Sequence, residues 1–527
     1  MSRHQVKTLT KHVESEPVVT PQRLIGYLAL VFGMFMAILD IQIVSASLSE
    51  IQAGLSASID EISWVQTSYL IAEVIMIPLS GFLSRALSTR ILFVASAAGF
   101  TLASVLCATA TSIEQMIVYR AIQGFIGGGM IPTAFAASYT IFPKRFQSPV
   151  MALVGLVVTL APTIGPTVGG YLTDAFSWHW LFLINVVPGI VATTLAWLLV
   201  DFDEPQFELL NRFDYFGLFT MAVFLGSLEY VLEEGQRDDW FASATITTLA
   251  VIAVVSATAF FWRVCTADEP IVDLTAFENR NFAVGSLFTF VLGIGLYGMT
   301  YLYPLFLQGV RGYNALQVGE TVFVTGMFMF VAAPIVGVLG RNLDPRLVIS
   351  CGFLGFAISA FELHPITAQW GFGELFIPQA LRGMSLMMCM VPINTMALGT
   401  LPPERIKNAS GLFNLTRNLG GAVGLAGINT VLSQRWDLHM ARLRDHVTWG
   451  RHVAVEQYQG MSEMMQGNLG SDAQMAALKQ LAMSVRHQAQ VMAFSDVFLI
   501  LAILFLALLL LIPLVDRSRG GETAPAH

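Results

Sequence analysis

Apolar segments long enough to cross a lipid bilayer follow one another along almost the whole chain of 527 residues. A membrane-spanning helix needs roughly 20 mostly apolar residues, and 55% of this chain is hydrophobic while only 12% is charged. Soluble domains carry about 25% charged residues, so the composition excludes a water-soluble globule, a peripheral protein and a single-anchor receptor. The four cysteines lie in or beside apolar runs, which excludes a secreted disulfide scaffold. The sequence therefore predicts an all-α polytopic membrane protein.

Fourteen apolar runs can be marked, each about as long as one bilayer crossing. They cover residues 24–46, 64–83, 91–109, 115–137, 148–172, 180–200, 214–232, 242–262, 283–307, 317–340, 346–363, 371–399, 412–433 and 494–515. The first run is too long for the core of a signal peptide and no small-residue cleavage site follows it, so we expect it to be retained.

The placement of Lys and Arg predicts the orientation of these spans. If the N-terminus is cytoplasmic, seventeen of the 28 Lys and Arg residues lie on that side, and the short loops opposite hold only Arg237 and Arg311. Because cytoplasmic loops carry the excess of positive charge, we expect fourteen spans with both termini cytoplasmic. The long segment 434–493 then faces outward, as a solvated tether or as a docking surface for another protein.

Within 434–493 we expect an amphipathic helix that starts at a capping box formed by Ser471 and Gln474. Apolar residues follow this point at helical spacing, and a capping box is a typical helix start. We expect a second helix near 434–446 to pair with it.

An internal repeat divides the chain. Residues 81–90 (GFLSRALSTR) and 337–346 (GVLGRNLDPR) align without gaps. Their shared positions include Gly81, Arg85 and Arg90 in the first stretch and Gly337, Arg341 and Arg346 in the second, which are the expected cytoplasmic gating loops. A weaker echo links residues 120–124 to 379–383. Repeated halves are how secondary transporters build a site that opens alternately to each side.

The repeat predicts two six-helix bundles plus two inserted transmembrane helices. The expected divisions are a cytoplasmic tail at 1–23, an N-terminal bundle at 24–200, a connector with the inserted pair at 201–264, a C-terminal bundle at 265–515 that includes 434–493, and a cytoplasmic tail at 516–527.

Ionisable side chains inside spans cost several kcal/mol to bury and usually mark ion or substrate paths. Here they are Asp40, Glu73, Glu229, Arg120, Arg382 and Arg417. At about 1.5 Å per residue, Asp40 and Arg120 lie at similar depth, so they can form an ion pair. That pair is either purely structural or responsive to protons, and Glu73 is either a proton or cation site or a hydrogen-bonded packing residue. We expect Arg382 and Arg417, the buried charges of the second half, to be structural.

The fifth run concentrates proline and glycine. Pro162 and Pro166 remove backbone donors and bend a helix, while Gly165, Gly169 and Gly170 let a neighbouring helix come close. We therefore expect a bent span packed tightly against another.

Several chemistries are not indicated by the sequence. It contains no Walker A sequence, HExxH, paired CxxC or G-x-S-x-G elbow, and no basic patch beyond the charges that set topology. We expect no enzyme activity, cofactor, metal site or nucleic-acid partner. Asp201 and Asp203 lie in a short acidic connector, which we interpret as a solvated loop rather than a metal site.

Together these motifs resemble the major facilitator superfamily and, more narrowly, its fourteen-span EmrB/QacA-type drug:proton antiporters, over nearly the whole chain. Residues 39–44 resemble the group's LDxTIV signature, with Gln42 in place of the usual Thr. Residues 64–70 are similar to its second-span entry, 120–124 match RxxQG, and 165–170 match the GPxxGG core of the antiporter motif.

The resemblance implies a role for Arg120 in proton coupling and favours exchange over symport through 165–170. This sequence departs from the family pattern at two places. Ser84 stands where the family has an acidic residue, so the usual gating salt bridge cannot form, and Glu73 stands where an apolar residue is expected. EmrB-like inner-membrane pumps of double-membraned bacteria work with a periplasmic adaptor and an outer-membrane channel. The resemblance therefore implies that 434–493 docks the adaptor.

We expect an inner-membrane pump that uses proton influx to export hydrophobic or amphipathic toxic compounds or drugs. Substrate would enter between the two bundles from the cytoplasm or the inner leaflet, and protonation of Asp40 and Glu73 would switch the open side. Two alternatives stay open: a proton-coupled uptake symporter for a small metabolite, and a non-transporting membrane sensor or scaffold.

Overall fold

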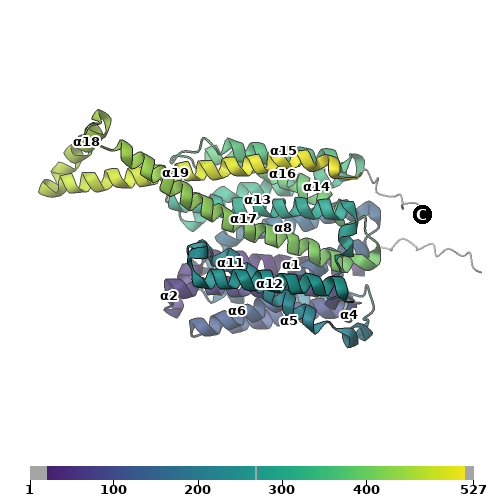
Figure 1. The fold of residues 1–527 in the computed structure, drawn as a ribbon. Helices are drawn as coiled ribbons and strands as arrows, with labels where there is room; N and C mark the ends of the chain where they lie inside the picture. Colours follow the sequence, from purple (N-terminus) through teal and green to yellow (C-terminus); the bar gives the residue numbers. More distant parts are fainter. Residues whose placement is uncertain (1–19, 268–269, 517–527) are drawn as a thin grey trace, which may run out of the picture.

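The computed structural model describes residues 20–267 and 270–516, which form a bundle of helices without any β-strand in these ranges (Figure 1). A helix satisfies its own backbone hydrogen bonds, as a lipid environment requires. Eleven described helices are long and apolar enough to cross a membrane, and twelve if a bent pair is counted as one span. All fourteen apolar runs lie in helices, but the helices of the fourth and thirteenth runs are not among those twelve. Fourteen crossings therefore stay a prediction.

The first part of the chain, up to the connector, is built from six long or paired helices with short helical turns between them. They are α1 (Pro21–Ala46), the short α2 (Leu48–Leu55) and α3 (Ile59–Ile62), α4 (Trp64–Leu87), α5 (Thr89–Ala108), α6 (Ile113–Gly127) with α7 (Met130–Ile141), α8 (Lys144–Ala175), and α9 (Trp180–Leu183) with α10 (Val186–Leu199).

A connector and a helix pair, α11 (Tyr215–Glu234) and α12 (Ala244–Thr266), separate this part from the second. The second part comprises α13 (Arg280–Gly309), α14 (Ala315–Asn342), α15 (Pro345–Glu362), α16 (Phe372–Leu398), α17 (Pro403–His446), α18 (His452–Leu469) and α19 (Ala473–Leu508). The described chain begins and ends at the same end of the bundle, called the terminal end below (Figure 1). This placement agrees with an even number of crossings.

At the opposite end, α17 and α19 run far beyond the other helices and α18 joins them (Figure 1). The prediction of separate helices in 434–493 was therefore wrong in part. Residues 434–446 continue the 44-residue α17, and 473–493 begin the 36-residue α19. A loss of apolar residues ends a membrane span but does not end a helix, and neither Gly nor Pro interrupts residues 428–446. The Ser471 side chain of the predicted capping box lies outside the described residues, and α19 itself has Asp472 as its N-cap, whose side chain makes no capping bond.

The two sequence repeats make equivalent contacts in the two parts of the chain. The Arg120 Nε donates to the carbonyl of Val65 at 3.1 Å, and the Gln379 Nε2 donates to the carbonyl of Thr321 at 2.9 Å. The two acceptors are 256 residues apart, which is also the offset between the repeated loop sequences.

Glycines repeat the same arrangement. A Cβ on Gly124 would lie 2.3 Å from the carbonyl oxygen of Tyr69, and a Cβ on Gly383 would lie 2.4 Å from that of Thr325. Tyr69 and Thr325 are again 256 residues apart. In both copies a glycine lets one helix touch the backbone of another, so the same helix crossing was built twice.

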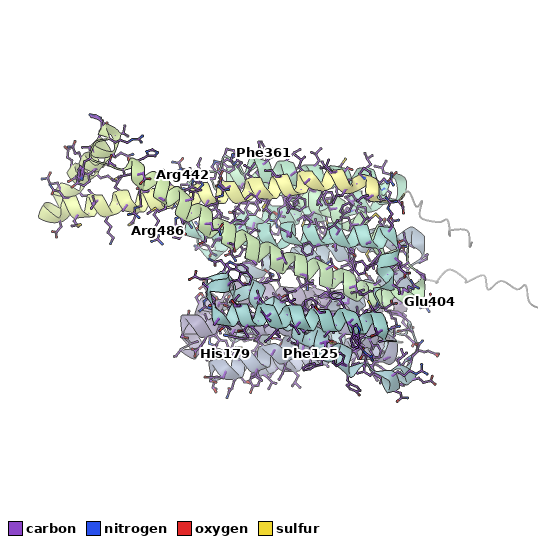
Figure 2. All side chains as sticks on the ribbon, in the orientation of Figure 1. Phe125, His179, Phe361, Glu404, Arg442 and Arg486 are labelled. Atoms are coloured by element: carbon purple, nitrogen blue, oxygen red, sulfur yellow. The ribbon has the colours of Figure 1, made fainter. Side chains whose placement is uncertain are left out.

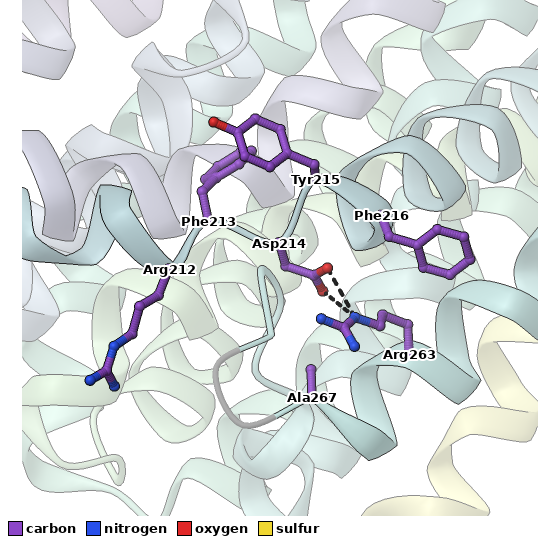
Figure 3. A pocket seen from close by; sticks show the side chains of 7 residues that line it. All are labelled: Arg212, Phe213, Asp214, Tyr215, Phe216, Arg263 and Ala267. Carbon is purple, nitrogen blue, oxygen red and sulfur yellow. Dashed lines mark hydrogen bonds and ion pairs between the residues drawn. The ribbon is translucent and has the colours of Figure 1, made fainter.

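The inserted pair α11–α12 packs against both parts, because α11 contacts α4 of the first and α17 of the second. An ion pair fastens the two inserted helices at the terminal end, in the pocket of Figure 3. There Asp214 accepts from the Arg263 Nε at 2.9 and 3.1 Å and also caps α11 through the Gly217 N–H. This pair holds the hairpin together. The division into six, two and six helices stays a prediction.

Candidate functional site

Asp40 and Arg120 form the ion pair that their expected depths allowed. Asp40 of α1 and Arg120 of α6 are fully buried, and the Arg120 Nη1 lies 2.7 Å from the Asp40 Oδ2. The other oxygen, Oδ1, accepts from the Asn185 Nδ2 at 2.6 Å and from the Gln123 Nε2 at 3.2 Å. The Asp40 carboxylate is thus surrounded by donors, and its removal would leave Arg120 without a counter-ion.

The Arg120 guanidinium is fixed from several sides. Its Nε donates to the Val65 carbonyl, its Nη1 also donates to the Gln123 Oε1 at 2.7 Å, and its carbon lies 4.2 Å from the centre of the Tyr69 ring. Stacking on an aromatic face is favourable for a desolvated cation. Removing one partner of such a buried pair costs about 3–5 kcal/mol. The free-energy change that follows a change of charge at Asp40 is therefore large enough to drive a conformational change.

Asn185 and Ser104 were not found from the sequence. Asn185 lies between α9 and α10, and its side chain, like that of Gln123, reaches the Ser104 hydroxyl of α5. A lone Asn inside the apolar run 180–200 was the available signal, because an amide in a membrane span needs partners. Gln123 lay within a recognised motif but had no role assigned.

Glu73 of α4 is buried but does not join the Asp40 pair. Only 3% of Glu73 is exposed, and its Oε1 has no hydrogen-bond partner in the described part of the chain. It lies close enough to Arg120 and to Arg417 for the charges to interact. Glu73 therefore interacts electrostatically with a buried arginine of each part, Arg120 and Arg417.

Arg417 of α17 faces the first part of the chain. Its Nη2 contacts the Asn414 Oδ1 at 2.5 Å, and its guanidinium lies 5.2 Å from the ring centre of Phe135 on α7. Arg382 of α16, by contrast, stays inside the second part, where its Nη2 donates to the Thr300 hydroxyl at 2.7 Å and to a carbonyl of α13. Arg382 has the surroundings of a packing residue, whereas Arg417 borders the interface between the two parts.

The proline- and glycine-rich helix α8 is bent and closely packed, as predicted. Its two segments, Phe146–Pro162 and Ile164–Ala175, meet at 42°. A Cβ on Gly165 would lie 2.5 Å from the Cβ of Gln42, two residues beyond Asp40. The glycine- and proline-rich stretch 162–170 therefore lies tightly against α1 beside the ion pair.

The rest of that motif continues the contact. A Cβ on Gly169 would lie 2.9 Å from the Ile43 carbonyl oxygen. Pro162 is buried at the bend, and Pro166 and Gly170 are half-buried on the following turns. The contact between α8 and α1 thereby extends over several turns of both helices.

The repeated loops lie at the terminal end and use glycine for close approach. A Cβ on Gly81 would lie 2.9 Å from the Asn408 Cα of α17, and one on Gly337 would lie 3.4 Å from the Pro149 Cα of α8. Each contact joins one part of the chain to the other. The Arg341 side chain lies outside the described residues.

The loop arginines make weaker contacts. Arg90 lies 3.9 Å from Asp201, with 41% and 82% of these side chains exposed. Arg85 and Arg346 are half-buried, and the Nε of each has no partner in the described ranges. The backbone carbonyl of Arg85 accepts the N–H of Gln206, so the connector lies across this loop.

The interpretation of the acidic connector as a solvated loop is wrong at Asp203. Its side chain is only 15% exposed, pairs with the Lys407 Nζ of α17, and accepts the Thr89 N–H at 3.0 and 3.1 Å. The Lys407 Nζ also donates to the Ser84 carbonyl at 3.0 Å. Asp203 of the connector thus places a negative charge beside this loop, in which Ser84 carries no charge. The exposed Asp201 does fit the solvated interpretation.

Comparisons with known proteins agree with this architecture. The family model of the Major Facilitator Superfamily matches residues 30–425, and the chain belongs to that superfamily. Among solved structures, the fold is similar to the human organic anion transporter MFSD10 (TM-score 0.54, 13% identity, 92% of this chain and 100% of that one). It is also similar to the proton:xylose symporter XylE (TM-score 0.57, 12% identity, 94% and 97%). Membership indicates a membrane transporter rather than an enzyme.

Full-length relatives narrow the class to EmrB-like members of the superfamily. The chain is 42% identical to the colistin resistance protein EmrB of Acinetobacter baumannii over 97% of this chain and 100% of that one. It is 32% identical to the multidrug export protein EmrB of Escherichia coli (98% and 100%) and to the fatty acid resistance protein FarB of Neisseria gonorrhoeae (94% and 97%).

Proposed function

We propose that this protein exports hydrophobic or amphipathic drugs or toxic compounds across the bacterial inner membrane in exchange for protons. The observation that carries the proposal is the fully buried Asp40–Arg120 pair, packed beside the bent α8. The names of the relatives, which refer to multidrug export and to resistance against colistin and fatty acids, support the substrate class.

In this proposal a proton from the outside binds Asp40 and releases Arg120 from its counter-ion. The pair then rearranges, α8 moves with α1, and the path between the two parts opens on the other side. Glu73, near both Arg120 and Arg417, takes part in the exchange. Each charge moved through the membrane potential contributes about 2.3 kcal/mol per 100 mV. No cofactor is needed, because the proton gradient supplies the energy.

The proposed topology has fourteen spans with both termini, and hence the terminal end, in the cytoplasm. The α17–α18–α19 extension then lies in the periplasm, where it carries exposed apolar side chains such as Trp449 (72% exposed) and Met464 (79%). Figure 2 shows this extension with its side chains, and Arg442 and Arg486 lie where α17 and α19 leave the bundle. Exposed apolar surface outside the membrane favours protein contacts, so we propose that it docks a periplasmic adaptor of a tripartite pump that ends in an outer-membrane channel.

Substitution of Asp40 by Asn tests the proposed exchange. The purified variant is reconstituted in proteoliposomes with a pH-sensitive dye inside, and substrate-induced proton movement is measured. Asn keeps the shape of Asp and accepts a hydrogen bond from Arg120 but cannot bind the proton, so we expect proton movement to be lost while the protein remains inserted. Undiminished proton movement in Asp40→Asn would overturn the assignment.

A further inference from the structure

We propose that the turn between the two inserted helices, residues 235–240, is a latch that holds the end of the bundle opposite the terminal end closed. This end, called the distal end below, is where α11 ends and α12 begins (Figure 1). The latch is anchored to the first part of the chain and reaches the second part through Trp240. The proposal concerns how the transporter opens, so it does not depend on which compound or ion is carried.

A hydrogen-bonded network fastens the distal end of α11 to α4 of the first part. The Thr67 hydroxyl donates to the Glu234 Oε1 at 2.9 Å, and both side chains are buried. The Arg237 Nη1 donates to the hydroxyl of Ser63, the N-cap of α4, at 2.7 Å and lies 3.4 Å from the Glu234 Oε2. Hydrogen bonds that involve an ionised group are among the stronger ones in proteins. We therefore expect the turn to move together with α4.

Trp240 connects this turn to the second part of the chain. Its Nε1 donates to the hydroxyl of Thr430 on α17 at 3.1 Å. The Thr430 hydroxyl itself donates to the Ala426 carbonyl at 2.8 Å, so its oxygen is held in place as an acceptor. An indole N–H that is withdrawn from water usually finds a hydrogen-bond partner, and the partner of the half-buried Trp240 belongs to the other part. This hydrogen bond therefore bridges the hairpin and α17.

The backbone of the turn is strained where it presents Trp240. Asp239 and Trp240 have φ angles of 55° and 53°, in the left-handed region that residues other than glycine rarely adopt. The Trp240 N–H donates to the Gly235 carbonyl at 2.6 Å, and a Cβ on Gly235 would lie 2.7 Å from the Trp240 ring. Backbone strain persists only where surrounding contacts hold it, and it is common in switch regions. The turn thus keeps a costly shape in which the Trp240 side chain reaches α17.

The two parts also touch directly at the distal end. A Cβ on Gly319, near the start of α14, would collide with the hydroxyl of Thr167, near the end of α8. The distal end is therefore closed in this structure, and opening it requires the two parts to separate there. Because the turn is fastened to α4, we expect it to stay with the first part and the Trp240–Thr430 hydrogen bond to break.

The test measures distances between spin labels on the full-length protein in lipid nanodiscs, in a background without the native cysteines. One label is at Ala244 at the start of α12, and the other is at Thr109 of the first part or Phe372 of the second, all three exposed positions. In Trp240→Phe, which keeps an aromatic ring but loses the donor, we expect the ratio of long to short Ala244–Phe372 distances to rise about fivefold, as for the loss of one hydrogen bond. The Ala244–Thr109 distances should stay unchanged.

A second variant and a matched control separate the hydrogen bond from packing. Thr430→Val removes the acceptor of the same bond and should give the same shift, and the double variant should shift no further, because the bond is already absent. The control is Trp436→Phe, the same substitution on α17, where the buried Nε1 has no hydrogen-bond partner among the described residues. It should leave both distances unchanged.

Unchanged Ala244–Phe372 distances in folded Trp240→Phe and Thr430→Val proteins would overturn the latch. An equal shift in Trp436→Phe, or additive shifts in the double variant, would also overturn it, because the effect would then come from packing. A longer Ala244–Thr109 distance would mean that the turn moves with the second part, which contradicts the anchoring to α4. Neither substrate nor a proton gradient is used in these measurements, so their failure leaves the proposed export function untouched.

Discussion

The pair formed by Asp203 and Lys407 should hold the terminal end of the transporter closed. Asp203 belongs to the connector after α10, and Lys407 to the first turns of α17, so the contact joins the two parts of the chain. The perturbation is Asp203→Asn, which removes the charge but keeps the size of the side chain. It weakens the contact with Lys407 and the two hydrogen bonds from Thr89.

The expected free-energy change follows from the burial of the Asp203–Lys407 pair. With 15% and 16% of the side chains exposed, this pair is far from a solvated surface pair. Hydrogen bonds to charged groups contribute about 1.5–3 kcal/mol, so we take about 2 kcal/mol, which is roughly a 30-fold change in an equilibrium constant. A terminal end that is open in about 1% of molecules would then be open in about 20%.

The assay measures the distance between spin labels at Leu198 of α10 and Leu347 of α15, both exposed near the terminal end. The labels are placed in a background without the native cysteines. We expect Asp203→Asn to enlarge the population with the longer distance. The control is Asp201→Asn in the same connector, where the exposed contact with Arg90 at 3.9 Å should change the equilibrium by about twofold or less. The reasoning is refuted if Asp203→Asn leaves the distances unchanged or if both variants shift them equally.

Two further predictions concern helix packing and the extension. Gly169→Ala should lower the melting temperature in detergent by a few degrees, because its Cβ would meet the Ile43 carbonyl at 2.9 Å and overpacking costs about 1–3 kcal/mol. The control Gly427→Ala, which has open space around its Cβ, should leave the melting temperature unchanged. Equal melting temperatures of the two variants would contradict the packing argument. Replacing the exposed Trp449 and Met464 by Ser should abolish adaptor-dependent drug resistance in cells but preserve exchange in proteoliposomes. Loss of both activities, or of neither, would contradict docking through the extension.

Local sequence patterns predicted the structural features that arise within one segment of the chain or from the depth of a residue in the membrane. The apolar runs predicted the helices, and the prolines predicted the bend of α8, because both effects arise within a few residues. The Asp40–Arg120 pair followed from depth alone, since few charged partners exist inside a membrane.

Contacts between distant segments were not predictable in this way. Asp203 and Lys407 are 204 residues apart, and each lies in a polar stretch where a solvated charge is the ordinary expectation. Asn185 meets Asp40 from 145 residues away because α9 gives way to α10 there. The continuity of α17 beyond the membrane was also missed, because hydrophobicity indicates the lipid boundary and not the end of a helix.

The two copies of the repeat share a backbone crossing but differ in charge, and this difference bears on the mechanism. In the first copy Arg120 reaches the Val65 carbonyl and binds the buried carboxylate Asp40. In the second copy Gln379 makes the equivalent contact with Thr321, and its Oε1 accepts a hydroxyl rather than meeting an ion. A neutral amide neither gains nor loses a proton, so only the first copy of this crossing can change its charge. If protons drive the exchange, the force therefore acts on the first part, and α11, α8 and the connector, which all contact the second part, must transmit it.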